Sequence, residues 1–134
     1  GNRRPNIGET IPEFAAKDIQ GRDLTKAEFI GRKTLVAFSS PTCGHCVKLM
    51  DEVREWEQSR RPRGPQLVIF TDGDHGEKTA GLIAPVIVDK DSRLAARFGM
   101  RGVPSAVLVD ETGTIVTEAA IGSKNIWSLI DGDH

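Results

Sequence analysis

The most constraining feature of this chain is a pair of cysteines, Cys43 and Cys46, between an apolar run and a stretch of helical periodicity. They are the only cysteines in its 134 residues. The run before them, residues 34–38, is mostly apolar without alternation, which predicts a strand covered on both faces. Two thiols at positions i and i+3 in the first turn of a helix lie on the same side of it, close enough to form a disulfide.

A disulfide between Cys43 and Cys46 closes too small a loop to stabilise a fold, so chemistry is the better explanation for the pair. Three other roles remain open: a structural zinc site, a haem attachment site and an inert buried pair. Zinc needs four ligands, and the three histidines are spread along the chain, with His134 at its end. Haem attachment needs a histidine directly after the second cysteine, where this chain has Val47. The start of a helix favours a reactive pair over an inert one.

The composition narrows the classes of function. The chain has 18 Lys and Arg against 19 Asp and Glu, a net charge of −1 that gives no bulk electrostatic case for nucleic acid or an acidic membrane. No apolar run approaches the roughly 18 residues needed to span a bilayer. The length suits one domain with a sizeable core. We expect a flexible N-terminus over residues 1–10, a single domain over 11–131 and a tail over 132–134.

Apolar runs and turn residues predict an α/β fold. The expected strands are residues 11–15, 33–39, 66–71, 85–88, 105–110 and 114–121, and the expected helices are residues 43–60, 77–82, 92–98 and 123–130. Asp91 or Ser92 is expected to cap the third helix, and Gly99 to end it. Strands separated by helices imply a parallel core, and a turn at residues 111–113 adds an antiparallel terminal hairpin.

The carboxyl end of the 33–39 strand is a favourable place for a reactive thiol. Reacting groups of a parallel sheet collect at this edge, and the unpaired N–H groups and dipole at a helix start stabilise a thiolate. We therefore expect Cys43 to be exposed and acidic, and Cys46 to be more buried and less acidic. This asymmetry suits thiol–disulfide exchange, in which Cys43 forms a mixed disulfide and Cys46 resolves it.

Two histidines are candidates for a part in this chemistry. An imidazolium at His45, between the cysteines, would favour the Cys43 thiolate and make the pair a stronger oxidant. The alternative is that His45 is an exposed residue with no effect. His75 follows the 66–71 strand, and its loop opens on the same edge if the strands are parallel. We hypothesise that His75 assists proton transfer; the alternative is a solvated loop histidine.

The motif and the order of elements together resemble the thioredoxin superfamily, over residues 11–130. A second motif, Gly102-Val103-Pro104-Ser105, precedes a strand about 60 residues after the cysteines. The resemblance implies that Pro104 is cis and packs against the cysteines; the alternative is an ordinary trans proline at a strand start. It also implies a thioredoxin-like fold, with a mixed sheet flanked by helices and an N-terminal hairpin extension. The substrate-binding residues that it implies are Thr42, Gly44, Val103 and Pro104, with the backbone of Val103 pairing with a substrate polypeptide.

Three segments resemble the TlpA/ResA-like branch of extracytoplasmic thiol–disulfide oxidoreductases: residues 12–22, 86–99 and 107–113. Ser40-Pro41-Thr42-Cys43 is similar to the MauD-like accessory proteins of that branch. The resemblance implies a periplasmic or membrane-tethered location, and because the chain begins with Gly1 we expect a signal or anchor to precede it. It implies protein thiol and disulfide substrates, a redox partner protein such as a membrane-bound one, no nucleic acid, and no metal or organic cofactor.

The chain departs from these families at the residues that usually handle protons. Many thioredoxins carry a buried aspartate six positions before the first cysteine, where this chain has Ala37. The ResA-type glutamate three positions after the second cysteine is replaced by Leu49. The usual proton acceptor for Cys46 is therefore missing or comes from elsewhere. Gly44-His45 matches the dipeptide of protein disulfide isomerases and favours an oxidising role, whereas the branch favours a reductase.

The leading interpretation is an enzyme that exchanges a Cys43–Cys46 disulfide or dithiol with protein substrates, as a protein disulfide reductase or oxidase. One alternative is a non-enzymatic thioredoxin-fold factor for the assembly or maturation of a dedicated client. Another is a thiol peroxidase, which is disfavoured because the Pro-x-x-x-Thr-x-x-Cys arrangement is absent around Cys43.

Overall fold

A mixed five-stranded sheet forms the centre of the computed structural model, which describes residues 7–59 and 64–131. The strand order is β5-β4-β3-β6-β7, in which β4 is parallel to β3 and β5, while β6 is antiparallel to β3 and β7. The strands are β3 (Thr34–Ser39), β4 (Gln66–Thr71), β5 (Val86–Val88), β6 (Ser105–Val109) and β7 (Ala120–Ile121). The parallel core and the antiparallel C-terminal strands predicted from the sequence are thus confirmed.

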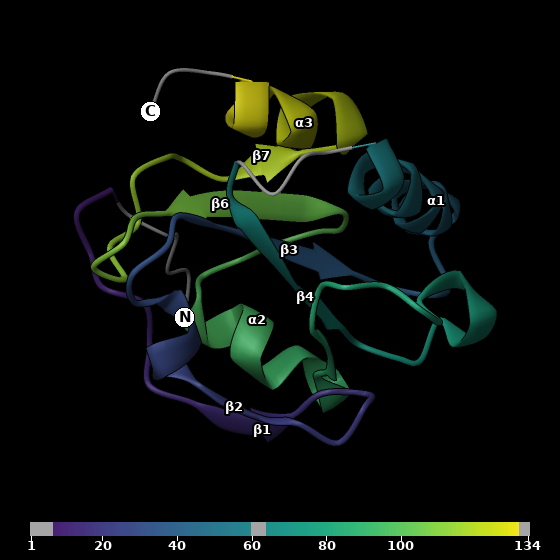
Figure 1. Ribbon diagram of the computed structural model, residues 1–134, viewed down its shortest axis with the longest axis horizontal. Coiled ribbons are helices and arrows are strands. Elements are labelled where there is room, and N and C mark those ends of the chain that lie inside the picture. Colours follow the sequence, from purple (N-terminus) through teal and green to yellow (C-terminus); the bar gives the residue numbers. More distant parts are fainter. Residues whose placement is uncertain (1–6, 60–63, 132–134) are drawn as a thin grey trace.

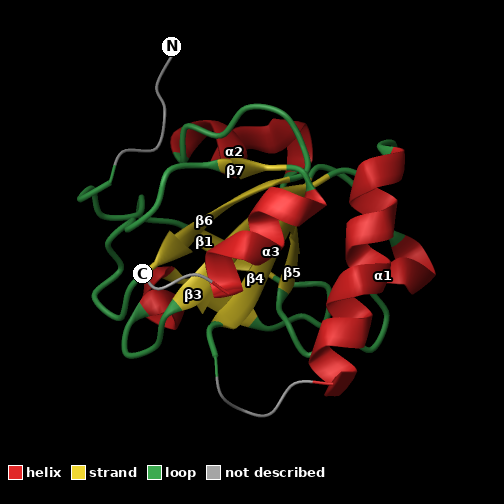
Figure 2. Ribbon diagram, turned by 90° about the horizontal axis from the view of Figure 1, so that it is seen from above, coloured by secondary structure: helices red, strands yellow, loops and turns green. Residues whose placement is uncertain are grey.

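The two faces of the sheet are covered by different layers (Figures 1 and 2). Helices α1 (Gly44–Ser59) and α3 (Ser123–Asp131) lie on one face, and α2 (Arg93–Arg97) and the N-terminal hairpin lie on the other. Every residue of β3 is buried, as its continuous apolar pattern predicts. Alternate residues of β3 enter different cores: Leu35 and Ala37 pack with the α1 residues, and Val36 and Phe38 pack on the hairpin side.

The N-terminal hairpin pairs β1 (Ala15–Lys17) with β2 (Asp23–Thr25) in a separate antiparallel sheet. The predicted hairpin extension is confirmed, but its first strand begins later than the predicted residues 11–15. The N–H of Ile11 donates to the carbonyl of Gly113 at 2.9 Å, so this segment lies against the C-terminal turn instead. The hairpin is followed by the 3-10 turn η1 (Lys26–Phe29).

The last strand is shorter than the sequence predicts. Over the predicted residues 114–121, only Ala120–Ile121 forms a ladder with β6, and Ile115 makes an isolated bridge to Val109. Between them, the hydroxyl of Thr117 accepts the N–H of Leu108 at 3.0 Å. A side chain thus takes the place of a backbone carbonyl, which interrupts the ladder.

The start of α2 agrees only partly with the prediction: of Asp91 and Ser92, Ser92 occupies the N-cap position, but its side chain makes no capping hydrogen bond to a described residue. Both residues have positive φ, 61° and 54°, within or next to the 3-10 turn η3 (Lys90–Ser92). The capping hydrogen bonds come from Asp89, whose carboxylate accepts the N–H groups of Leu94 at 2.8 Å and Ala95 at 2.9 Å. Gly99, with φ 77°, ends the helix as predicted.

The helix predicted at residues 77–82 is only a 3-10 turn, η2 (Gly76–Lys78), followed by turns. Residues 1–6 and 132–134, which belong to the predicted N-terminal segment and tail, lie outside the described residues.

Across the part of the chain that the structure describes, no helix is both long and apolar enough to cross a membrane.

Candidate active site

The two cysteines lie where the polypeptide leaves β3 and enters α1, both as free thiols. Cys43 directly precedes the helix, and its carbonyl accepts the N–H of Val47 at 3.0 Å. Its side chain is partly exposed, whereas Cys46, one turn further, is completely buried. The predicted difference in exposure is confirmed.

The N-terminal turn of α1 supplies the groups that make Cys43 acidic. The backbone N–H of Cys46 contributes most to lowering the pKa of Cys43, followed by the thiol of Cys46, and the backbone N–H of His45 adds to this effect. Burial acts in the opposite direction but does not reverse the shift. The predicted acidity of Cys43 therefore arises from donors that point at its sulfur.

Burial, and after it the neighbouring Cys43, raise the pKa of Cys46 to about 11. Hydrogen bonds from the backbone N–H of Ser40 and the hydroxyl of Ser39 act against this rise. The two sulfurs thus differ in the direction predicted from the sequence, with a nucleophile at the surface and a protonated thiol beneath it.

His45 is exposed, and its contribution to Cys43 comes from the backbone N–H. Any residue other than proline at position 45 would provide the same backbone N–H. The predicted effect of the imidazole on the Cys43 thiolate stays a prediction.

A second loop reaches the cysteines from far along the chain. The Val103–Pro104 peptide bond is cis, as the resemblance implied. The carbonyl oxygen of Val103 lies 3.9 Å from the sulfur of Cys43. Pro104 is buried, whereas the side chain of Val103 is 38% exposed. The fold therefore brings the backbone of Val103 to the reactive sulfur, beside Thr42 and Gly44, which are both exposed.

His75 is not the solvated loop residue that the sequence left as an alternative. Only 9% of its surface is exposed, and its Nε2 lies 2.9 Å from the hydroxyl oxygen of Ser39. Its Nδ1 is buried and has no hydrogen-bond partner among residues 7–59 and 64–131. Burial lowers the pKa of His75, against the opposing charges of Asp72 and Asp74.

Ser39 was missed by the sequence reading, although it joins His75 to Cys46. The residue ends β3 on the same face as Leu35 and Ala37, because alternate residues of a strand share a face. A buried serine at the carboxyl end of an otherwise apolar strand, four positions before a cysteine, was the available signal.

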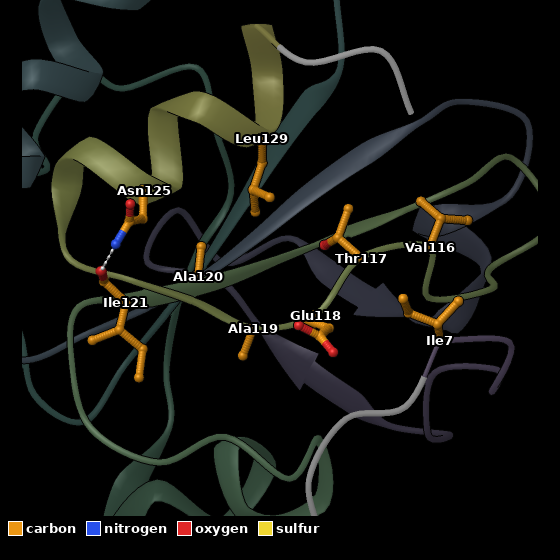
Figure 3. Close-up of a pocket in the computed structure, with 9 residues that line it drawn as sticks. All are labelled: Ile7, Val116, Thr117, Glu118, Ala119, Ala120, Ile121, Asn125 and Leu129. Carbon is orange, nitrogen blue, oxygen red and sulfur yellow. Dashed lines mark hydrogen bonds between the residues drawn. The ribbon is translucent and has the colours of Figure 1, made fainter.

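The reactive sulfur lies apart from the surface hollow of about 650 Å³ shown in Figure 3. That hollow is lined by Ile7, by residues 116–121 and by Asn125 and Leu129 of α3, and includes neither cysteine nor Pro104. Within residues 7–59 and 64–131, no group of three or more His, Cys, Asp or Glu side chains is placed to hold a metal ion.

Residues 20–131 match the family model of the thioredoxin-like domain. The chain belongs to the thioredoxin-like family. This match covers most of the chain and includes the cysteines, His75 and the cis-proline loop. The thioredoxin-like fold expected from the sequence is therefore confirmed.

Named relatives agree with this placement. The chain is 24% identical to the thiol-disulfide oxidoreductase ResA of Geobacillus thermodenitrificans, over 81% of this chain and 66% of that protein. It is 29% identical to the methylamine utilization protein MauD of Paracoccus denitrificans, over 97% of this chain and 67% of that protein. The chain thus spans about two thirds of the length of these relatives, and the similarity to ResA supports thiol–disulfide oxidoreductase function.

A solved structure agrees with the fold. StoA from Bacillus subtilis superposes with a TM-score of 0.69 and 21% identity, over 89% of this chain and 94% of that structure. At this identity the likeness concerns the architecture, which is the same mixed sheet with helices on both faces.

Proposed function

We propose that this protein is a thiol–disulfide oxidoreductase that exchanges its Cys43–Cys46 dithiol or disulfide with thiols and disulfides of other proteins. The observation that carries the proposal is the opposite direction of the two pKa shifts, lowered for Cys43 and raised to about 11 for Cys46. An exposed thiolate that attacks and a buried thiol that reacts second are what stepwise exchange requires.

In the reducing direction, the thiolate of Cys43 attacks one sulfur of a substrate disulfide, and the other sulfur leaves as a thiolate that takes a proton from water. The Cys46 thiol then loses its proton and attacks the sulfur of Cys43. The mixed disulfide breaks, the Cys43–Cys46 bond forms and the second substrate sulfur leaves. Two electrons have passed to the substrate, and the oxidising direction is the reverse sequence.

The substrate polypeptide binds across the surface formed by Thr42, Gly44, Val103 and Pro104. Support comes from the exposure of the first three residues and from the 3.9 Å between the Val103 carbonyl and the Cys43 sulfur. A substrate strand that pairs with the Val103 backbone would hold its own sulfur near Cys43. Backbone pairing is independent of sequence, so this surface suits more than one protein substrate.

The proposed location is extracytoplasmic, with a redox partner protein that keeps the cysteine pair in its working state. Support comes from the relatives named ResA and MauD and from the segment resemblances to that branch. His45 is proposed to tune the pair through the charge of its ring.

The proposal is tested with Cys43→Ser and Cys46→Ser variants and a disulfide-bonded protein substrate such as insulin. We expect the wild-type protein to catalyse reduction of the substrate in the presence of dithiothreitol. Cys43→Ser should lose this turnover, and Cys46→Ser should accumulate a covalent mixed disulfide visible by mass spectrometry. Turnover that survives in Cys43→Ser would contradict the proposal, and binding of a single client without turnover would favour an assembly factor.

A further inference from the structure

The exchange mechanism leaves the proton of Cys46 without an acceptor. A thiol with a pKa of about 11 is almost fully protonated at neutral pH and must lose its proton before it attacks. The positions of the carboxylates that the resemblance led us to look for hold Ala37 and Leu49, and both side chains are only 1% exposed. These positions are filled with apolar atoms, so another group must take the proton.

A buried polar chain leads away from the sulfur of Cys46. The hydroxyl of Ser39 lies near enough to this sulfur to lower the pKa of Cys46, and its oxygen lies 2.9 Å from Nε2 of His75. Ser39 is 1% exposed and Cys46 is fully buried, so water does not compete along this route. Ser39 is two residues after Ala37 on β3, so it lies on the same face of the strand, which is the face toward α1.

We propose that Ser39 and His75 form a proton relay that accepts the proton of Cys46 when this thiol resolves the mixed disulfide. The inference rests on the proposed exchange reaction and assigns the acceptor that the reaction needs. His75 acts on Cys46 through Ser39 and does not touch the substrate, so it is a positioning and proton-accepting residue.

The Cys46 thiol loses its charged hydrogen-bond acceptor when Cys43 forms the mixed disulfide. In the reduced protein, the thiolate of Cys43 accepts a hydrogen bond from the Cys46 thiol. Once Cys43 is bonded to a substrate sulfur it carries no charge and becomes a weak acceptor. The relay then offers the Cys46 thiol another acceptor, the hydroxyl oxygen of Ser39.

Burial favours the protonation state that a relay needs. It lowers the pKa of His75, so the imidazole is neutral at neutral pH and has one nitrogen free to accept a proton. When that nitrogen is Nε2, it faces the Ser39 hydroxyl. The hydrogen is then on Nδ1, which has no partner in the part of the chain that the structure describes. A buried nitrogen without a partner is uncommon in folded proteins and is found at functional sites.

Two neighbouring carboxylates partly offset the effect of burial on the pKa of His75. Asp72 and Asp74, both in its own loop, favour the imidazolium and oppose the effect of burial. From β3 and α1, the groups that reach it are the Ser39 hydroxyl and, through it, the Cys46 thiol. The histidine can therefore be neutral before the step and stabilised as a cation during it.

The loop that carries His75 is fixed against β3 and the loop before Cys43. The N–H of Asp72 donates to the carbonyl of Ser39 at 3.1 Å, and the carboxylate of Asp74 accepts the N–H of Gly76 at 2.7 Å. A Cβ added to Gly73 would lie 3.0 Å from the ring of Pro41, so a side chain at this position would press on that ring. His75 is thus held at the distance that the relay requires.

The proton of Cys46 passes to the oxygen of Ser39 while the hydroxyl hydrogen of Ser39 passes to Nε2 of His75. The Cys46 thiolate attacks the Cys43 sulfur, and the bond between Cys43 and the substrate breaks. The substrate thiolate leaves and is protonated by water, and the imidazolium of His75 returns its proton to water.

The reaction of the full reduced chain with the aromatic disulfide dithiobis(nitrobenzoate) separates the two steps, because each step releases one coloured thionitrobenzoate. The first release reports attack by Cys43, and the second reports resolution by Cys46. The mixed disulfide is formed at mildly acidic pH, where the second step is slow, and is then mixed rapidly into buffers of higher pH.

We expect His75→Gln and Ser39→Ala to slow the second release by roughly 10- to 100-fold at neutral pH, the size of a general-base contribution. The first release should stay within about twofold, which shows that the fold and Cys43 are intact. The second release of both variants should rise steadily with pH toward the pKa of Cys46, whereas the wild-type rate should level off once His75 is neutral.

Thr79→Val is the matched control, because Thr79 is also buried in this region and its hydroxyl donates to the carbonyl of Gly76 at 3.2 Å. We expect its second release to match the wild type. A wild-type rate and pH profile in His75→Gln would overturn the relay, as would equal slowing in Thr79→Val. Absence of any second release in the wild type would instead overturn the proposed exchange function.

Discussion

The sulfur of Cys43 lies 3.9 Å from the carbonyl oxygen of Val103, although the two residues are 60 positions apart in the sequence. This contact joins the start of α1 to the cis-proline loop at one surface. A polypeptide that pairs with the Val103 backbone is thereby placed beside the nucleophile before any bond forms. Positioning of this kind lowers the entropy cost of the first attack.

The two cysteines should react with alkylating reagents over different pH ranges. Only thiolates alkylate rapidly, and a lowered pKa shifts the thiolate of Cys43 to lower pH, whereas the pKa of about 11 shifts that of Cys46 to higher pH. At neutral pH we expect iodoacetamide to modify Cys43 almost exclusively, as measured by peptide mass spectrometry. In denaturant the two residues should react equally, and equal labelling of the folded protein would contradict the asymmetry.

Replacing His45 by alanine separates the ring from the backbone. The variant keeps the N–H that lowers the pKa of Cys43 but loses the imidazole. If the ring stabilises the thiolate, the reduction potential of the pair should fall by about 30 mV, which is tenfold in the equilibrium constant with a reference dithiol.

Lys48→Ala is the control for His45→Ala, because it removes an exposed cation one turn further along α1. We expect its potential to stay close to that of the wild type. An equal potential for His45→Ala and wild type would mean that only the backbone at this position acts on Cys43.

Asp89 should matter for stability because its carboxylate accepts two N–H groups at the start of α2. We expect Asp89→Ala to lower the free energy of unfolding by about 1–2 kcal/mol, as measured by urea denaturation. Asp89→Asn, which keeps one acceptor oxygen, should lose less. Asp91→Ala is the control, because Asp91 was a cap candidate in the sequence. If it lowered the free energy of unfolding as much as Asp89→Ala, the capping role of Asp89 would be contradicted.

A side chain at Gly73 is expected to crowd the ring of Pro41. An added Cβ would lie 3.0 Å from the Pro41 ring, so Gly73→Ala should lower the free energy of unfolding by about 1–3 kcal/mol, the usual cost of overpacking. Nothing lies within 4 Å of a Cβ added to Gly44 in the first turn of α1, so Gly44→Ala should be neutral or slightly stabilising. Equal stability of Gly73→Ala and wild type in urea would contradict the close approach.

The sequence predicts local features of this site well, because Cys43 and Cys46 are set by a strand that runs directly into a helix. Their exposure and the directions of their pKa shifts follow from that junction alone. The cis bond before Pro104 was accessible only through resemblance, since a single sequence does not distinguish cis from trans.

The environment of His75 was beyond sequence reasoning, because its burial depends on the pairing of β3 with β4. That pairing sets Ser39 opposite Thr71 and fixes where the following loop lies. The interruption at Thr117 was missed for a similar reason, since its hydroxyl replaces a backbone acceptor only after β6 is in place. Contacts of this kind arise between elements and leave no periodic pattern in the chain.

The reduction potential of the Cys43–Cys46 pair, measured by equilibration in redox buffers and alkylation, tests the central claim most directly. Because the thiolate of Cys43 is stabilised, we predict a value between about −270 mV and about −120 mV, the range of pairs that exchange disulfides with proteins. A value below about −300 mV, typical of structural disulfides, would contradict the assignment of this pair to catalysis.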